Sequence, residues 1–192
     1  MAFALKCTLV FAFLMTFLSS EVLYGNPIDC RVLVVMSYEE DFVWVREMKA
    51  GIESALADRC KTSYLYMNTR ENIAGGNNKA REAWERYKEF KPHGVIAADD
   101  NAQSMFVVPY LKGKVETPVM FCGVDSKPER YGYPAANVSG ILQRIHLLET
   151  LIFLKQLLPD VEKVGFMMKK GPTAMATIEH VKNDTKVSPV QI

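Results

Sequence analysis

Short apolar runs alternate with longer segments of helical period through the first two thirds of the chain. "CRVLVVMS" (Cys30–Ser37) is apolar without polar alternation, which is typical of a strand buried on both faces of a parallel sheet. From Asp41 onward, apolar residues recur at helical spacing and predict an amphipathic helix. The order then repeats, with "TSYLYM", "VIAA" and "PVMFCG" as strands and with helices near 80–90 and 101–111 between them. This order predicts βαβ units, and therefore an α/β fold with a doubly wound parallel sheet.

The polar residues that directly follow these strands form a candidate binding site. In a parallel sheet covered on both faces, ligands bind beyond the carboxyl ends of the strands. The residues placed at this edge are Ser37, Tyr38, Asp99, Asp100, Asn101, Cys122 and Gly123. Asp and Asn are also favoured N-caps, so one of the two aspartates could simply cap the helix that follows. Two carboxylates exceed what capping requires, and we expect at least one of Asp99, Asp100 and Asn101 to face a ligand.

Residues 1–25 differ from the rest of the chain. One early cation, Lys6, precedes an almost unbroken apolar run from Cys7 to Leu18. This pattern is typical of a secretory signal peptide, because the run is shorter than the roughly 20 apolar residues that span a membrane. An uncleaved membrane anchor is the alternative. We expect cleavage after Gly25, or else after Ser20, and a periplasmic or secreted location.

The cysteines fit an exported chain. Cys30 and Cys60 stand at the amino ends of two strands, and such ends lie about 4.8 Å apart if the strands are neighbours. That separation allows a disulfide, and export allows oxidation. Two reduced, half-buried thiols are the alternative. Cys122 has no partner in this scheme and is interpreted as a small packing residue.

Composition and charge narrow the function classes. The chain has 192 residues, of which 49% are hydrophobic and 23% charged, as in a globular protein with a real core. Lys and Arg total 23 against 22 for Asp and Glu, so a nucleic-acid partner is not expected. The histidines His93, His146 and His180 are scattered, and neither a nucleophile elbow nor a phosphate-binding loop occurs. We therefore expect a protein that is not an enzyme and that needs no metal or cofactor.

The organisation changes beyond Gly123. Residues 124–140 form a polar connection with Pro and Gly, long for a loop within one domain. We interpret 26–123 as a first α/β lobe, 124–140 as an inter-lobe crossing and 141–192 as the incomplete start of a second α/β lobe. The elements expected in that start are a Leu-rich helix near 143–158, a strand within "PDVEKVGFMM" and a helix near 173–182.

"VLVVMSYEEDFVWVREMKAGIESAL" and "GVIAADDNAQSMFVVPYLKGKVETPVMFCGV" carry a family resemblance. Both stretches resemble first-lobe strands and helices of the substrate-binding proteins of ABC transporters, which have the type I periplasmic binding fold. "NVSGI", the Leu-rich helix and "LLPDVEKVGFMM" resemble the bridge and the second-lobe opening of the same family. The resemblance covers residues 30–184.

The resemblance implies an extracytoplasmic receptor that closes on a small solute between two lobes and delivers it to a membrane permease. It implies that the strand-end residues form the first-lobe half of the cleft, and that Asn137, Ser139 and Gly140 belong to the hinge region. The aspartates would suit an amine, so an amino acid or related compound is the expected solute, while Tyr38 would suit an aromatic or apolar one. A similar module serves as the extracytoplasmic sensor of signalling proteins, so transport and sensing stay open.

We expect this chain to depart from the family by lacking most of the second lobe, as if truncated. Since half a cleft cannot bury most of a ligand, we expect weak solute binding or none. We also expect aggregation through exposed apolar faces of Leu147, Leu151 and Phe166. The alternative from another class is a complete single-domain enzyme in which Asp99 and Asp100 would hold a divalent cation.

Overall fold

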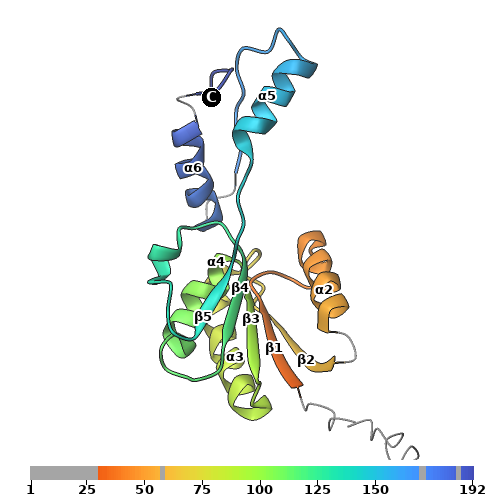
Figure 1. Cartoon of the computed structure of the whole chain (residues 1–192), viewed down its shortest axis with the longest axis vertical. Helices are drawn as coiled ribbons and strands as arrows, with labels where there is room; N and C mark the ends of the chain where they lie inside the picture. The colour runs from red at the N-terminus through yellow and green to blue at the C-terminus, as the bar shows by residue number, and fades with distance from the viewer. Residues whose placement is uncertain (1–29, 57–58, 169–171, 185–186) are drawn as a thin grey trace, which may run out of the picture.

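A five-stranded, wholly parallel sheet with the strand order β2-β1-β3-β4-β5 forms the centre of the protein (Figure 1). The computed structural model describes residues 30–56, 59–168, 172–184 and 187–192. The strands are β1 (Cys30–Met36), β2 (Cys60–Tyr66), β3 (Gly94–Ala98), β4 (Val119–Val124) and β5 (Val138–Leu142). The predicted α/β class and parallel sheet are confirmed.

Helices cover both faces of the sheet because its central strands are apolar on both sides. Alternate residues of β1 point to opposite faces, so Val34 packs toward α2 while Leu33 packs toward α3 and η3. The helical elements that pack on the sheet are α2 (Val43–Leu56), α3 (Gly76–Phe90), the short α4 (Asp99–Ala102) and its π-helical continuation η3 (Gln103–Leu111). Two 3-10 turns, η2 (Ile73–Gly75) and η4 (Pro128–Tyr131), complete this part.

The sheet extends past the lobe boundary that the sequence suggests at Gly123. After β4 ends at Val124, the chain passes through η4 and returns to the sheet as β5, which pairs in parallel with β4 through Val119 and Val138. The sequence of β5 gives little strand signal, because it contains Ser and Gly. In the structure, Ile141 of this strand is 71% exposed. The connection to α5 (Leu147–Leu157) begins only after Leu142.

Cys30 and Cys60 form a disulfide at the amino ends of β1 and β2. The two residues are direct partners in the parallel register, with their Cα atoms 4.4 Å apart. The bridge therefore fixes edge strand β2 to the central strand β1, and Cys122 is the free cysteine of the described residues.

Replacing both Cys30 and Cys60 by Ser is expected to lower the free energy of unfolding by about 3 to 4 kcal/mol, because the unfolded chain gains the freedom of the open loop of 30 residues. Urea unfolding of the double variant and of the wild type measures this loss. A thiol assay on the unfolded, unreduced mature chain is the companion test. One reactive thiol supports the bridge, whereas three would exclude it.

Residues beyond Leu142 form a separate small unit that stands past the carboxyl ends of the strands (Figure 1). It contains α5 and α6 (Pro172–Asp184). The expectation that Leu147 and Leu151 are exposed is wrong, because both are buried in a cluster with Val190. Phe166 is 41% exposed, as expected. The apolar side chains exposed here also include Ile152, Phe153, Leu157, Leu158 and Met167.

The signal-peptide prediction, residues 1–25, lies outside the described residues, and so do Cys7 and the side chain of His180. Within the described part of the chain, none of the helices combines the length and the apolar character needed to traverse a bilayer.

Candidate functional site

Ser37 lies at the carboxyl end of β1 and ties this strand to β3 and α4. Its Oγ donates to the Ala98 carbonyl at 2.7 Å and accepts from the Ala102 backbone N–H at 2.8 Å. The N-cap residue of α4 is Ala98, which makes no side-chain bond. Ser37 therefore ties β1 to the first turn of α4, while Asp99 makes the local bond that the sequence suggests for an aspartate here, since its Oδ1 accepts from the Asn101 backbone N–H at 3.4 Å.

Asp99 has the most unusual surroundings at this edge of the sheet. Its φ of 72° lies in the left-handed region, which Asp tolerates better than most residues. The side chain is 3% exposed, and its Oδ2 accepts from the Tyr38 hydroxyl at 2.8 Å. Burial, opposed by this hydrogen bond and reinforced by the charge of Asp100, raises the pKa of Asp99 to about 7. Backbone strain and a raised pKa together mark Asp99 as a functional-site candidate.

Asp100 has a different role, because its carboxylate is surrounded by donors. Oδ2 accepts from the Asp125 backbone N–H and Oδ1 from the Ser126 backbone N–H, both at 3.2 Å. The Tyr131 hydroxyl also donates to Oδ1. Burial, and the bond to Asp100, raise the pKa of Tyr131 well above its usual value. Asp100 therefore holds the loop after β4 against the end of β3.

Asp99, Asp100 and Asp125 together form what we call the aspartate cluster. All three are buried, and one carboxylate oxygen from each lies within 4.8 Å of the others. The charges of Asp100 and Asp125 contribute to the raised pKa of Asp99, so a proton or a cation at Asp99 would relieve the repulsion. Beside it, the buried Oδ1 of Asn101 has no hydrogen-bond partner among the described residues. The site can thus accept hydrogen bonds from a cationic donor group.

Sequence reasoning missed three residues of this site: Asp125, Thr69 and Tyr131. Asp125 directly follows β4, so the strand-end rule could have found it. Thr69 accepts from the Asn101 side-chain amide at 2.9 Å and donates to the Ser37 carbonyl at 2.6 Å. Tyr131 comes from η4, and no local sequence signal indicates that it returns to Asp100.

Cys122 and Gly123 lie at the same edge but supply no charged or hydrogen-bonding side chain there. Burial raises the pKa of the Cys122 thiol to about 11, so it is uncharged at neutral pH. Gly123 has a φ of 64°, and a Cβ at this position would lie 2.6 Å from the Trp44 ring. Glycine is therefore required here for both backbone conformation and space.

The candidate hinge residues lie at or within the sheet rather than in the connection to α5. Asn137, at the amino end of β5, donates to the Leu111 carbonyl at 3.0 Å and accepts from the Gly113 N–H at 2.9 Å. Ser139 and Gly140 are part of β5, and a Cβ on Gly140 would collide with Phe121. This placement follows from β5 joining the sheet, which the sequence does not reveal.

A pocket of about 430 Å³ separates the loop after β4 from α6. Its lining residues are Ser126, Lys127, Glu129, Arg130, Met175, Ile178, Glu179 and Lys182. Lys127 and Glu179 form an ion pair across it. Since Ser126 also donates to Asp100, the pocket adjoins the aspartate cluster. The carboxyl edge of the sheet, the cluster and α6 therefore meet in one region of the molecule (Figure 1).

Comparison with known proteins finds solved structures of similar fold. No protein-family model matches the chain, and no curated protein matches it. A conserved domain protein from Vibrio cholerae aligns with 84% of this chain at 16% identity and a TM-score of 0.64. An ABC domain from Streptococcus pneumonia in complex with L-Trp aligns with 85% at 14% identity and a TM-score of 0.61.

A third solved structure is the ligand-free, open form of a substrate-binding protein with adhesive properties from Clostridium difficile. It aligns with 84% of this chain at 14% identity and a TM-score of 0.60. The chain spans about half the length of these proteins, since the alignments cover 55% of each. The five-stranded parallel sheet and its helices therefore have the fold of the first lobe of a type I periplasmic binding protein.

Proposed function

We propose that this chain is part of an extracytoplasmic solute receptor that binds a small amine-bearing solute, such as an amino acid, against the aspartate cluster. The observation that carries the proposal is Asp99, a strained and buried carboxylate at the carboxyl edge of a sheet whose fold relatives include substrate-binding proteins. One of those relatives is a complex with L-Trp, which is an amino acid.

An ammonium group fits the cluster better than a metal ion does. Both oxygens of Asp100 already accept hydrogen bonds, and so do both oxygens of Asp99, from the Tyr38 hydroxyl and from the Asn101 backbone N–H. Oxygen-bound cations such as Ca²⁺ take six to eight ligands, so water would have to supply most of them here. An ammonium needs only three acceptors. The Asn101 Oδ1 atom and the remaining lone pairs of the Asp99 oxygens can supply them, and we therefore favour a receptor over the acidic-site enzyme.

A binding experiment tests the proposal on the chain itself. Because this sheet edge alone cannot bury most of a solute, binding is expected to be weak, and L-tryptophan at millimolar concentration should shift the NMR signals of residues 98–101 and 125–126 in isotope-labelled protein at pH 7.5. N-acetyl-L-tryptophan, which lacks the ammonium group, is the matched control and is expected to leave them unchanged. Asp99→Asn should weaken binding at least tenfold, or about 1.4 kcal/mol. Equal shifts with both compounds would contradict the role of the amine.

The proposal also covers export of the chain and delivery of the bound solute. We infer that residues 1–25 direct export, that the solute passes to a membrane permease, and that sensing is the alternative to transport. The apolar run from Cys7 to Leu18 supports export. Mass spectrometry of the exported chain is expected to find Asn26 as its first residue, with cleavage after Ser20 as the alternative. A chain that keeps residues 1–25 in the membrane fraction would favour an anchor.

A further inference from the structure

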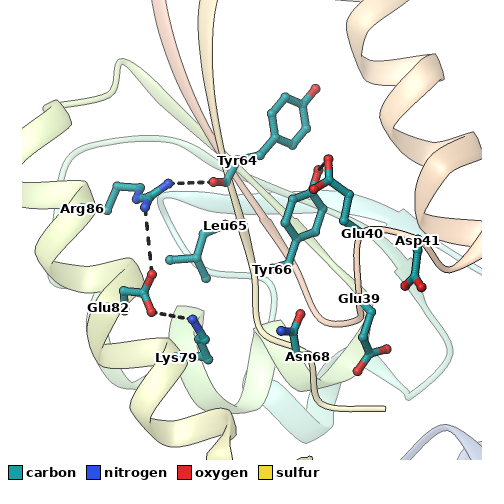
Figure 2. Close-up of a pocket in the computed structure, with 10 residues that line it drawn as sticks. All are labelled: Glu39, Glu40, Asp41, Tyr64, Leu65, Tyr66, Asn68, Lys79, Glu82 and Arg86. Carbon is teal, nitrogen blue, oxygen red and sulfur yellow. Dashed lines mark hydrogen bonds and ion pairs between the residues drawn. The ribbon is translucent and has the colours of Figure 1, made fainter. Parts of the chain in front are cut away.

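A second, polar pocket lies on the outer side of edge strand β2 (Figure 2). Its volume is about 470 Å³, within the usual range of binding pockets. Its lining residues are Glu39, Glu40, Asp41, Tyr64, Leu65, Tyr66, Asn68, Lys79, Glu82 and Arg86. We call this pocket the edge groove, because β2 forms its floor between residues 39–41 on one side and α3 on the other.

The backbone of β2 turns hydrogen-bonding groups toward the edge groove. The Met67 N–H bonds the Met36 carbonyl of β1, so the alternation of a strand directs the N–H and C=O groups of Tyr64 and Tyr66 outward. The Arg86 guanidinium confirms this direction, because its Nη1 donates to the Tyr64 carbonyl at 2.8 Å (Figure 2). The outward groups of Tyr66 have no backbone partner among the described residues. An exposed edge of this kind is a template for an added strand.

The two walls of the edge groove differ in charge. On the α3 wall, Glu82 pairs with Lys79 at 2.7 Å and with Arg86 at 3.9 Å, so one acidic group faces two basic groups and this wall is weakly positive (Figure 2). On the opposite wall, Glu40 is paired with Lys49 at 2.8 Å, while Glu39 and Asp41 add further negative charge. The second wall therefore favours a positively charged occupant.

Glu39 is the residue that points to a ligand. Its side chain is only 7% exposed, and its Oε1 accepts from the Glu71 backbone N–H at 2.9 Å. Its Oε2 is buried and has no hydrogen-bond partner among the described residues. A buried carboxylate oxygen without a donor is costly, and a basic side chain in the groove would supply that donor.

A bare metal ion does not fit the edge groove. Among the described residues, the aspartate cluster is the compact group of acidic side chains that could hold an ion, and the groove carboxylates form no such group. We propose that the edge groove binds an extended basic peptide segment of a partner protein, which pairs with the outer edge of β2 and places a Lys or Arg side chain against Glu39. The groove residues are not those of the aspartate cluster, so the proposal does not rest on solute binding there.

A peptide titration tests this proposal. A hexapeptide of alternating Val and Lys is added to the isotope-labelled chain, and the same peptide with Glu in place of Lys is the control. The Lys peptide is expected to shift the signals of residues 64–68 and to slow hydrogen exchange at the Tyr66 amide at least tenfold. Exchange at Leu65, whose amide already faces β1, should stay unchanged.

Two variants sharpen the result. Glu39→Gln keeps an acceptor for the Glu71 N–H but loses the charge, and it is expected to weaken peptide binding at least fivefold. Glu116→Gln, an exposed change just before β4, is the matched control and should bind like the wild type. Equal binding of the Lys and Glu peptides, or unchanged exchange at Tyr66, would overturn the proposal. Hydrogen exchange at the Tyr66 amide is measured in the wild-type chain, so it tests strand pairing by the peptide even if Glu39→Gln fails to fold.

Discussion

Replacing Asp99 by Asn is expected to stabilise the protein at pH 8 and to leave its stability at pH 4 almost unchanged. Because the pKa of Asp99 is raised from 3.8 to about 7 in the folded state, folding retains a proton that the unfolded chain has released. The native state therefore loses stability as pH rises from about 4 to about 7. Each tenfold change in proton affinity is worth about 1.4 kcal/mol, so the total loss is on the order of 4 kcal/mol.

Asn avoids this loss because it carries no charge, and it also tolerates the left-handed backbone of position 99. Urea unfolding of the variant and the wild type at pH 4.5, 6, 7 and 8 measures the difference. The gap between the two proteins should widen with pH and level off above pH 7. A gap that is independent of pH, or a variant less stable than the wild type at pH 8, would contradict the raised pKa.

The same substitution at the next residue is expected to have the opposite effect. Asp100→Asn should lower the free energy of unfolding by on the order of 3 to 5 kcal/mol, because hydrogen bonds to charged groups contribute about 1.5 to 3 kcal/mol each. Asn replaces one acceptor oxygen by an amide donor, so one amide N–H, that of Asp125 or Ser126, would lose its acceptor. The remaining bonds, including that from the Tyr131 hydroxyl, would lose their charged acceptor.

Denaturant unfolding at pH 7 measures this loss, and Tyr131→Phe is the companion variant. Tyr131→Phe removes one of the three donors and keeps the ring, so it should cost less than Asp100→Asn. The double variant should cost less than the sum of the two single changes, because they share a hydrogen bond. An Asp100→Asn protein as stable as the wild type would show that this carboxylate does not hold the loop after β4.

The strands of the first lobe and the location of the site could be predicted from sequence because both depend on local patterns. β1 is an unbroken apolar run, and polar residues follow β1 and β3 directly. The strand-end rule then placed Ser37, Tyr38, Asp99 and Asp100 at one edge, where the structure brings them together.

The features that sequence could not supply depend on contacts between distant residues. Ser37, Asp99 and Asp100 all directly follow a strand, so the sequence gives them the same expected position. Their roles differ because Ser37 and Asp100 are hydrogen-bonded to backbone groups of other elements. Leu147 and Leu151 are covered by Val190, about 40 residues along the chain. β5 is short, contains Gly140 and exposes Ile141, so its pattern does not resemble that of a buried strand.

The titration of the Asp99 carboxyl group, followed by carbon-detected NMR with and without L-tryptophan, tests the central claim most directly. Without the amino acid, the carboxyl is expected to titrate with a pKa near 7. With saturating L-tryptophan, an ammonium group against Asp99 would favour the carboxylate and lower that pKa by at least one unit. An Asp99 pKa near 4 in the free protein, or the same pKa with and without the amino acid, would contradict the account.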